Sequence, residues 1–282
     1  MDCSTEEIVA QIKELCACSW DGQEISFHDP LSIFGGTLRH CFHREQVLGL
    51  LAKLQAPVRL NLRKCRLGCL PPELCMKLEA ADLSCNNLRT VPDWAVRPCM
   101  RHLNLGSNFL ATLPNVPPDL LTLKVHKNRI RELPPLPRGL TNLNLYLNPV
   151  PIPDLDFPRL EAFSYGGCTH LKELPPLALA HNLRWLILVA NNIEFLPKDF
   201  TGLGSLEGVW LAKNNLKRLP EDIGSMKMRD ITLYQNDLSR LPDSFFSLKL
   251  RKLNLSRNPL RRADRKKATE VFAGIEFFEM IP

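Results

Sequence analysis

The chain of 282 residues contains no apolar run of the roughly 18 to 20 residues that a membrane-spanning helix needs. Its first residues, 1–7, are acidic and lack the basic and then apolar order of a signal peptide. Glycine is scarce, with 14 residues, and proline is abundant, with 23, so a glycine-rich linker protein is excluded. Apolar residues make up 45% and charged residues 23%, which is the balance of a folded chain without a membrane span.

The ten cysteines lack the spacing of a zinc site or of a disulfide framework. Nine of them precede residue 100, none follows Cys168, and no Cys-x-x-Cys pair exists. Reduced thiols in an intracellular, cytoplasmic protein are therefore expected. The nearest approach to a metal-binding set has the wrong spacing, so we favour buried thiols and surface imidazoles over zinc, and no cofactor is predicted. That set comprises Cys16, Cys18, His40, Cys41 and His43.

Negative charge is concentrated near the N-terminus. Residues 1–55 hold four Lys or Arg and eight Asp or Glu, a net charge of −4. The remainder holds 36 − 4 = 32 basic and 30 − 8 = 22 acidic residues, a net charge of +10. This excess could favour an acidic partner or an anionic surface, but it is small for a nucleic-acid binder. No specific nucleic acid is predicted as a partner.

One pattern, apolar-x-apolar-x-x-Asn-x-apolar-x-x-Leu-Pro, recurs ten times from residue 58 onward. Its Asn position recurs at intervals of 20 to 23 residues, and apolar residues stand three and five positions before it. Alternation of apolar and other residues indicates a short strand with one buried face, and such a strand must stack on the next repeat. The Asn positions are Cys65, Asn86, Asn108, Asn128, Asn148, Cys168, Asn191, Asn214, Asn236 and Asn258.

Each Asn stands where the chain turns away from its strand, so its amide can satisfy backbone groups that the bend leaves unpaired in the core. The prolines that follow cannot continue a helix, which predicts an outer side that is mostly extended or 3-10 helical. The spacing and the Asn column match the leucine-rich repeat consensus. The chain is thus identified as an α/β leucine-rich repeat solenoid of about ten parallel strands in one continuous sheet.

The two ends of the chain are predicted to be helical caps. Residues 1–55 form the N-terminal cap, with helices near 4–18 and 43–54, and residues 56–260 form the repeats. Residues 261–282 form the C-terminal cap, with a helix over 262–272. Open ends of a repeat array need such covers, so we predict one cooperative solenoid domain and a monomer. The basic run in the last cap could touch lipid or nucleic acid, although a solvated helix is favoured; it comprises Arg261, Arg262, Arg265, Lys266 and Lys267.

The repeats with an interval of 20 residues share the form L-P-x-x-P-x-x-L, as in 113–120 and 133–140. This form resembles the repeats of bacterial type III secreted effectors of the YopM and IpaH kind. Later repeats, such as 214–223, are similar to the intracellular Ras-group repeats of eukaryotic scaffolds. IpaH-type effectors carry a ubiquitin-ligase domain with a Cys-x-Asp motif, which is missing here, so that activity does not carry over.

No phosphate-binding loop, nucleophile elbow, kinase signature or zincin helix is present in the sequence, so we predict no catalytic residues and no enzyme. Function should then lie on the concave face, whose side chains alternate with the buried ones. Large apolar groups gather there around the recess expected at Gly166-Gly167. The predicted partner-binding residues are Tyr146, Leu147, Trp185, Ile187, Val189, Trp210, Lys213 and Tyr234, with Arg63, Lys124, His126 and Arg257 as secondary candidates.

Aromatic and basic residues of this kind dominate protein-binding hot spots, which favours a protein partner over a cap, loop or dimer mate covering the patch. The sequence therefore predicts a non-catalytic adaptor, scaffold or inhibitor. One version is a secreted effector acting in a host cytoplasm, and another is a eukaryotic signalling scaffold. A third is the substrate-recognition subunit of a ligase or phosphatase assembled in trans.

Overall fold

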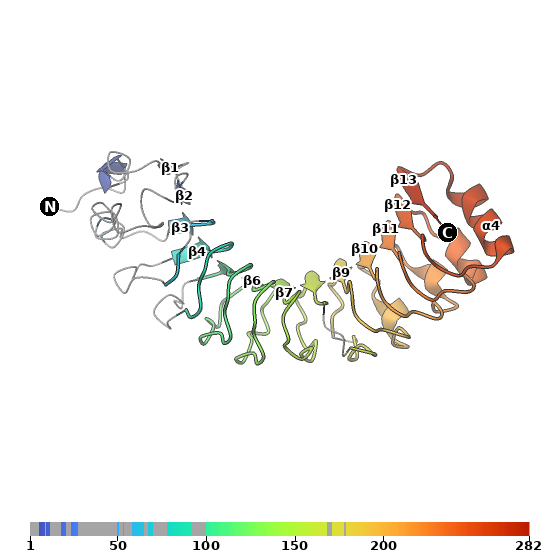
Figure 1. Ribbon diagram of the computed structural model, residues 1–282, viewed down its shortest axis with the longest axis horizontal. Helices are drawn as coiled ribbons and strands as arrows, with labels where there is room; N and C mark the ends of the chain where they lie inside the picture. The colour runs from blue at the N-terminus through green and yellow to red at the C-terminus, as the bar shows by residue number, and fades with distance from the viewer. Residues whose placement is uncertain are drawn as a thin grey trace. The chain divides into compact units, whose positions relative to one another are not determined.

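The computed structural model describes residues 6–8, 10–11, 18–20, 24–27, 50, 53, 58–64, 67–69, 78–91, 100–167, 171–177 and 179–281. It divides into two compact units, Met1–Leu140 and Thr141–Pro282. Within each unit, short strands lie side by side and are joined by mostly extended loops (Figure 1). No helix in the described ranges is long and apolar enough to cross a membrane.

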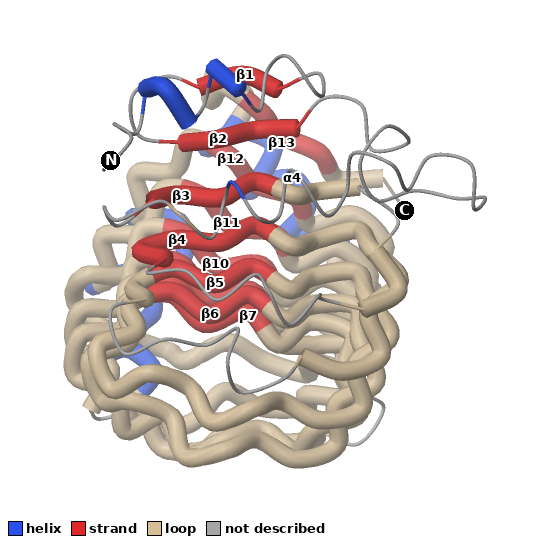
Figure 2. The backbone as a smooth tube through the Cα atoms, turned by 90° about the vertical axis from the view of Figure 1, so that its left-hand side faces the viewer, coloured by secondary structure: helices blue, strands red, loops and turns tan. Residues whose placement is uncertain are grey.

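In the described residues of the first unit, six short strands lie in a row. An antiparallel pair, β1 and β2, is followed by strands that run parallel to β2 and to one another, seen as stacked rows in Figure 2. The strands are β1 (Cys18–Trp20), β2 (Glu24–Phe27), β3 (Val58–Asn61), β4 (Leu78–Asp82), β5 (His102–Asn104) and β6 (Thr122–Lys124).

The part of the second unit that the structure describes contains a row of seven parallel strands. They are β7 (Asn142–Asn144), β8 (Ala162–Ser164), β9 (Trp185–Ile187), β10 (Gly208–Trp210), β11 (Asp230–Thr232), β12 (Lys252–Asn254) and β13 (Phe277–Glu279). Its outer side carries the 3-10 turns η3 (Phe200–Gly202), η4 (Ile223–Ser225) and η5 (Asp243–Ser247), and the helix α4 (Arg262–Phe272).

The core of each unit lies between the strands and the outer loops. The middle residue of a strand points inward and is fully buried, as Leu103, Phe163 and Leu186 are, whereas its two neighbours point to the concave face. Aromatic rings close the core at the end of the second unit, where Phe245 meets Phe272 edge-on with centroids 5.8 Å apart. A three-residue strand cannot bury this face alone, so each repeat depends on its neighbours.

The Asn column forms a ladder of buried amides. Asn214 is typical: its Nδ2 donates to the carbonyl of Leu211 in its own repeat at 3.0 Å and to that of Leu188 in the preceding repeat at 2.8 Å. Its Oδ1 accepts from the backbone N–H of Ile193 at 3.2 Å. Asn86, Asn108, Asn128, Asn236 and Asn258 repeat these contacts.

The residue before each ladder position adopts a left-handed backbone conformation. Nine of these residues are not glycine and have φ between 55° and 61°, namely Lys64, Cys85, Ser107, Lys127, Leu147, Ala190, Lys213, Gln235 and Arg257, and Gly167 has φ 72°. This conformation costs about 1–2 kcal/mol for a residue with a side chain. The cost is offset because the turn places the following amide inside the core, where it pairs with backbone groups of two repeats.

The structure confirms the leucine-rich repeat solenoid. All ten predicted strands are present as β3 to β12, the outer side is extended with 3-10 turns, and α4 spans the predicted 262–272. The helix predicted near 4–18 is too long, because Cys18 begins β1. Of the helix near 43–54, only Leu50 and Lys53 lie within the described residues. Cooperativity of the whole chain as one domain stays a prediction.

Three strands lie outside the predicted repeats. The predicted helical N-terminal cap contains β1 and β2, and the C-terminal cap adds β13 beside β12. Both caps therefore extend a sheet. The repeat consensus could not find these strands, because they lack its Asn and its Leu-Pro step.

We expect Asn214→Ala to lower the free energy of unfolding by about 3 kcal/mol or more. The substitution leaves two buried carbonyls and one buried N–H group without hydrogen-bond partners. Urea unfolding followed by circular dichroism measures the change. Asn215→Ala is the matched control, because Asn215 is exposed, and its effect should stay within about 0.5 kcal/mol. Equal losses in the two variants would contradict the structural role of the ladder.

Candidate functional site

The predicted binding residues of the second unit lie where the strand pattern placed them. We call Tyr146, Leu147, Trp185, Ile187, Val189, Trp210, Lys213 and Tyr234 the aromatic surface. None of these side chains is buried in the core, whereas the inward neighbours Leu186, Leu188 and Leu211 are at most 1% exposed. The register sets Ile187 beside Trp210, so β9 and β10 bring a branched aliphatic side chain and an indole together on the concave face.

Two tryptophans form the centre of the aromatic surface. The rings of Trp185 and Trp210 have centroids 5.8 Å apart and planes inclined by 36°, so they contact each other. Small neighbours give Trp185 its room, because its strand partners are Ala162 on one side and Gly208 on the other. A Cβ at Gly208 would lie 2.3 Å from Cζ3 of Trp185. The indole therefore lies across the Gly208 backbone, held against β10.

The glycines of the sixth repeat do not leave the predicted recess. A Cβ at Gly166 would stand 1.9 Å from the carbonyl oxygen of Val189, and one at Gly167 would stand 2.2 Å from Cδ2 of Leu147. Backbone bonds tie the same place together, because Leu147 N–H donates to the Gly166 carbonyl at 2.7 Å. The glycines permit this close approach, and the space beside them is filled.

Cations border the aromatic surface on its C-terminal side. The guanidinium of Arg257 lies 5.4 Å from the ring centroid of Tyr234, a cation–π contact within the chain. Lys213 is exposed, and its φ of 57° turns it out of the strand. Arg257, a secondary candidate, thus adjoins the surface, and one face of Tyr234 already has a cationic neighbour.

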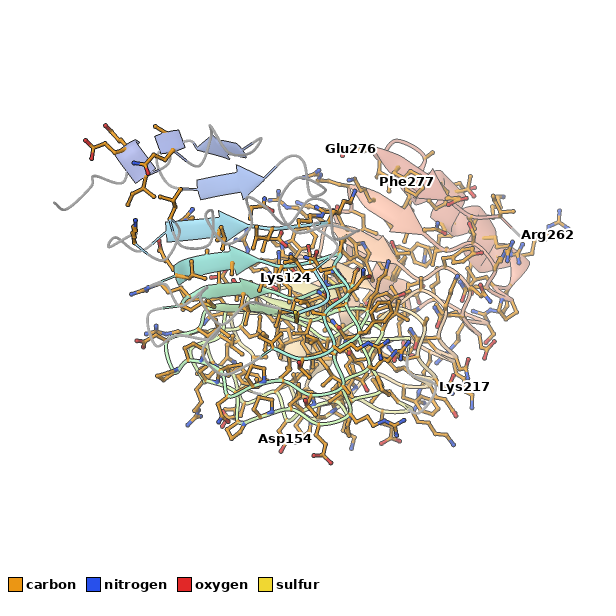
Figure 3. All side chains as sticks on the ribbon, turned by 60° about the vertical axis from the view of Figure 1, so that its left-hand side comes forward. Lys124, Asp154, Lys217, Arg262, Glu276 and Phe277 are labelled. Atoms are coloured by element: carbon orange, nitrogen blue, oxygen red, sulfur yellow. The ribbon has the colours of Figure 1, made fainter. Side chains whose placement is uncertain are left out.

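The other secondary candidates, Arg63, Lys124 and His126, belong to the first unit. Lys124 lies at the end of β6 (Figure 3), and the ring of His126 covers Gly106, where an added Cβ would come within 2.1 Å of Cε1. Burial, followed by the charges of Lys127 and Lys124, lowers the pKa of His126. These residues give the first unit a mainly basic concave face.

The basic run of the C-terminal cap is largely used within the fold. Lys267 reaches Asp243 at 2.9 Å and lies over the ring of Phe246, and Arg261 pairs with Asp264. Arg265 donates to the carbonyls of Leu260 and Asn258. Arg262 projects away from the helix into solvent (Figure 3). Most charges of this run therefore contact groups of the fold itself, whereas the prediction favoured a solvated helix.

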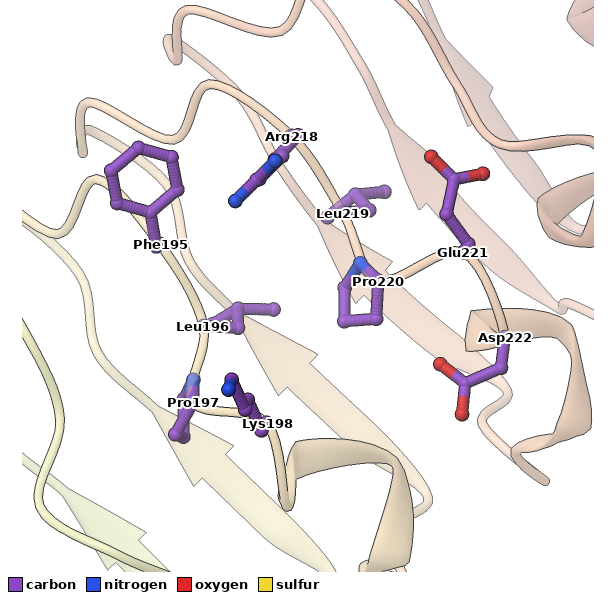
Figure 4. A pocket seen from close by; sticks show the side chains of 9 residues that line it. All are labelled: Phe195, Leu196, Pro197, Lys198, Arg218, Leu219, Pro220, Glu221 and Asp222. Carbon is purple, nitrogen blue, oxygen red and sulfur yellow. The ribbon is translucent and has the colours of Figure 1, made fainter.

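A pocket on the outer side of the second unit was not predicted. It has a volume of about 300 Å³ and is lined by the segments 195–198 and 218–222 (Figure 4). Two of its charged groups have contacts within the chain: Arg218 lies 5.1 Å from the Phe195 ring, and Glu221 pairs with Arg240. The lining residues are Phe195, Leu196, Pro197, Lys198, Arg218, Leu219, Pro220, Glu221 and Asp222.

No group of three metal-ligating side chains was found among the residues that the structure describes. The candidate set of Cys16, Cys18, His40, Cys41 and His43 lies outside the described side chains, so the metal-free prediction stays a prediction. Cys69 and Cys85 are free thiols.

The parallel strands, the amide ladder and the extended outer side define the class: the chain is a leucine-rich repeat solenoid. No family model matches it. In sequence it is 31% identical over 144 residues to epiphycan of Gallus gallus, covering 50% of this chain and 39% of epiphycan.

The similar solved structures are also leucine-rich repeat proteins. A leucine-rich repeat protein of Leptospira interrogans has a TM-score of 0.69 and 27% identity, covering 82% of this chain and 62% of that one. YopM of Yersinia enterocolitica has a TM-score of 0.55 and 28% identity, and the match covers 72% of this chain and 41% of that YopM chain. YopM of Yersinia pestis, described as a leucine-rich effector protein, has a TM-score of 0.56 and 26% identity, and the match covers 70% of this chain and 60% of that YopM chain. The chain thus spans less than two thirds of each relative.

We expect Trp210→Ala and Leu211→Ala to differ sharply in stability, although the residues are adjacent. Leu211 is 1% exposed, so its truncation leaves a core cavity and should cost about 2–5 kcal/mol of unfolding free energy. Trp210 faces outward and should cost far less. Urea unfolding of both variants measures this, and a larger loss for Trp210→Ala would place the indole in the core.

We expect the unfolding free energy to fall as the pH drops below about 6.5, in part because the pKa of His126 is lowered in the fold. Below that pH His126 takes up a proton more readily in the unfolded chain than in the folded chain, which favours unfolding. Well above the ordinary pKa of histidine, His126 is neutral in both states and does not make the unfolding free energy depend on pH. His126→Gln should show a smaller difference than the wild type between about pH 7.5 and about pH 5.5 in urea unfolding. His181→Gln, at an exposed position, is the control. An unchanged difference in His126→Gln would refute the assignment.

Proposed function

We propose that the chain is a non-catalytic protein-interaction module that binds a protein partner through the aromatic surface. The likeness to a leucine-rich repeat protein of Leptospira interrogans and to the leucine-rich effector YopM supports an interaction module in general. The observation that carries the specific proposal is the pair of contacting indoles, Trp185 and Trp210, on the concave face. Large aromatic rings that stay partly exposed at the centre of a surface are typical of binding hot spots.

The side chains at the centre of the aromatic surface are held rigidly, which favours binding. Trp185 is packed against β10 and Trp210, and the strands beneath are joined by backbone bonds such as Leu188 N–H to the Trp210 carbonyl at 2.8 Å. A rigid aromatic side chain loses little conformational entropy on binding, so more of its contact energy appears as affinity. The outer pocket at Phe195 is a weaker candidate, because Arg218 and Glu221 in its lining already contact groups within the chain.

The setting in which the module works is part of the proposal. The likeness to YopM, together with the L-P-x-x-P-x-x-L repeats, supports an effector that acts in a host cytoplasm. A cytoplasmic scaffold, or the recognition subunit of an enzyme assembled in trans, would use the same surface in the same way. In each version the chain acts as a monomer without turnover, as an adaptor, scaffold or inhibitor.

The experiment is a comparison of captured proteins followed by a measured affinity. Wild type, Trp210→Ala and Phe195→Ala are immobilised and exposed to the same cell lysate, and bound proteins are quantified by mass spectrometry. We expect a protein that the wild type and Phe195→Ala retain and Trp210→Ala loses. With that protein purified, Trp210→Ala should raise Kd by about 30-fold or more, which corresponds to about 2 kcal/mol.

Phe195→Ala is a matched control because Phe195 is an aromatic residue with 36% of its surface exposed, but it belongs to the outer pocket. Loss of the partner in Phe195→Ala alone would move the binding site to the outer side. Retention of every captured protein by Trp210→Ala, with its fold intact, would refute the aromatic surface as the site.

A further inference from the structure

Asp230 is a buried carboxylate in a column of residues that otherwise faces the concave surface. It is the first residue of β11, yet only 9% of it is exposed. Its Oδ1 is inaccessible and has no hydrogen-bond partner among the described residues. Burying a polar atom without a partner is unfavourable, and more so for a group that carries charge. The carboxylate takes no part in the asparagine ladder or in the apolar core, so neither explains why an aspartate is buried at this position.

The strand register places Asp230 beside the paired indoles. Across the strands, Trp185, Gly208, Asp230 and Lys252 stand in one row, because Gly208 is aligned with both Trp185 and Asp230. Adjacent strands lie roughly 4.8 Å apart, and the Trp185 ring fills the space over Gly208. The indole therefore extends from β9 toward β11, and the carboxylate lies at the edge of the aromatic surface.

The cations near Asp230 inside the chain leave its carboxylate unpaired. Arg184 pairs with Glu207 at 2.7 Å, and Arg251 pairs with Glu276 at 3.1 Å. Arg229 precedes Asp230 and is exposed, and Lys252 is exposed on the next strand. Among the described ion pairs, none joins Asp230 to Lys252 or to Arg229. An indole pair with an unpaired carboxylate at its edge is a site for a cation supplied from outside.

We propose that the aromatic surface binds an arginine side chain of the partner protein, stacked on the Trp185 and Trp210 indoles and donating to Oδ2 of Asp230, because Oδ1 of that carboxylate is enclosed by the chain. Arginine fits better than lysine, because its planar guanidinium can stack on an indole while its N–H groups reach a carboxylate. A hydrogen bond between two charged groups is stronger than a neutral one. The surrounding Ile187 and Val189 would contact apolar residues that flank the arginine. This inference rests on the proposed function of the same surface.

The test uses a phage-displayed library of random peptides as the probe. The library is selected on the full wild-type chain, and binders that also bind Trp210→Ala are removed. The remaining peptides are synthesised, and their Kd values are measured for wild type, Asp230→Asn and Lys252→Met. We expect arginine at one position of most peptides and a Kd raised about tenfold or more by Asp230→Asn. Replacing that arginine by lysine should weaken binding, and citrulline should weaken it further.

The two variants separate recognition from structure. Asp230→Asn keeps the shape of the side chain, and its thermal unfolding shows whether the fold is intact; should it fail to fold, Asp230→Ser replaces it. Lys252→Met removes the cation on the neighbouring strand, so it should leave the Kd within about twofold or lower it. An equal loss of affinity in Lys252→Met and Asp230→Asn would mean that the two residues act as a pair within the chain, which overturns the inference.

The remaining outcomes distinguish this inference from the proposed function. Peptides that depend on Trp210 but lack arginine, or that bind Asp230→Asn unchanged, would overturn the arginine site and leave the aromatic surface as the binding site. A selection that yields no peptide whose binding is lost in Trp210→Ala would overturn both the arginine site and the aromatic surface as binding sites for peptide ligands. Enrichment of lysine in place of arginine would overturn the guanidinium assignment.

Discussion

The buried asparagine amide is the interaction on which the rest of the structure depends. A strand of three residues followed by a sharp turn leaves backbone carbonyls and N–H groups inside an apolar core, and no strand or helix partner is available for them. One primary amide supplies two donors and an acceptor at that point, which is what two successive turns of the chain require. Asn214 shows the full set of contacts, with partners in its own repeat and in the preceding one.

The ladder also determines what the concave face can display. The left-handed residue before each amide reverses the chain. The outward side chains of the preceding strand therefore stay on the concave face and are not needed for the ladder. This freedom has limits, because several outward residues support the turn. Asn104 and Asn144, for example, accept from the backbone N–H two residues later at 3.1 Å. Where such polar residues are replaced by Ile187 and Trp210, the surface gains apolar area without loss to the ladder.

The ladder weakens where the short and long repeats meet. The Nδ2 of Asn191 reaches the Tyr165 carbonyl only at 3.5 Å, and its Oδ1 is buried without a partner among the described residues. Gly166 and Gly167 lie in the same region and allow backbone segments to approach closely. The side chains of Tyr146 and Leu147 are therefore separated from the indoles by a tightly packed segment, in which Tyr165 donates its hydroxyl to the Val150 carbonyl at 2.9 Å.

Sequence periodicity was enough to predict the ten repeat strands and the outward direction of Trp185 and Trp210, since alternation and the Asn column are local signals. It could not predict how neighbouring repeats contact one another. The overlap of Trp185 with Gly208 depends on register between residues 23 apart, and the position of Asp230 in the same row depends on the register of the next strand pair. The strand β13 was missed because the Asn and the Leu-Pro step of the consensus do not follow it, although Phe278 aligns with the buried Leu253.

The reach of the ladder bonds bears on how such a chain can change its length in evolution. Each amide joins its own repeat to the adjoining one, with partners 2 to 26 residues away, as in the contacts of Asn214 and Asn86. Duplication of a whole repeat would therefore reproduce every bond and add one more row of concave side chains. Insertion of a single residue between strand and amide would instead exchange the inward and outward columns of that strand. Growth by complete units is thus the neutral route, and each added unit brings new surface for selection to act on.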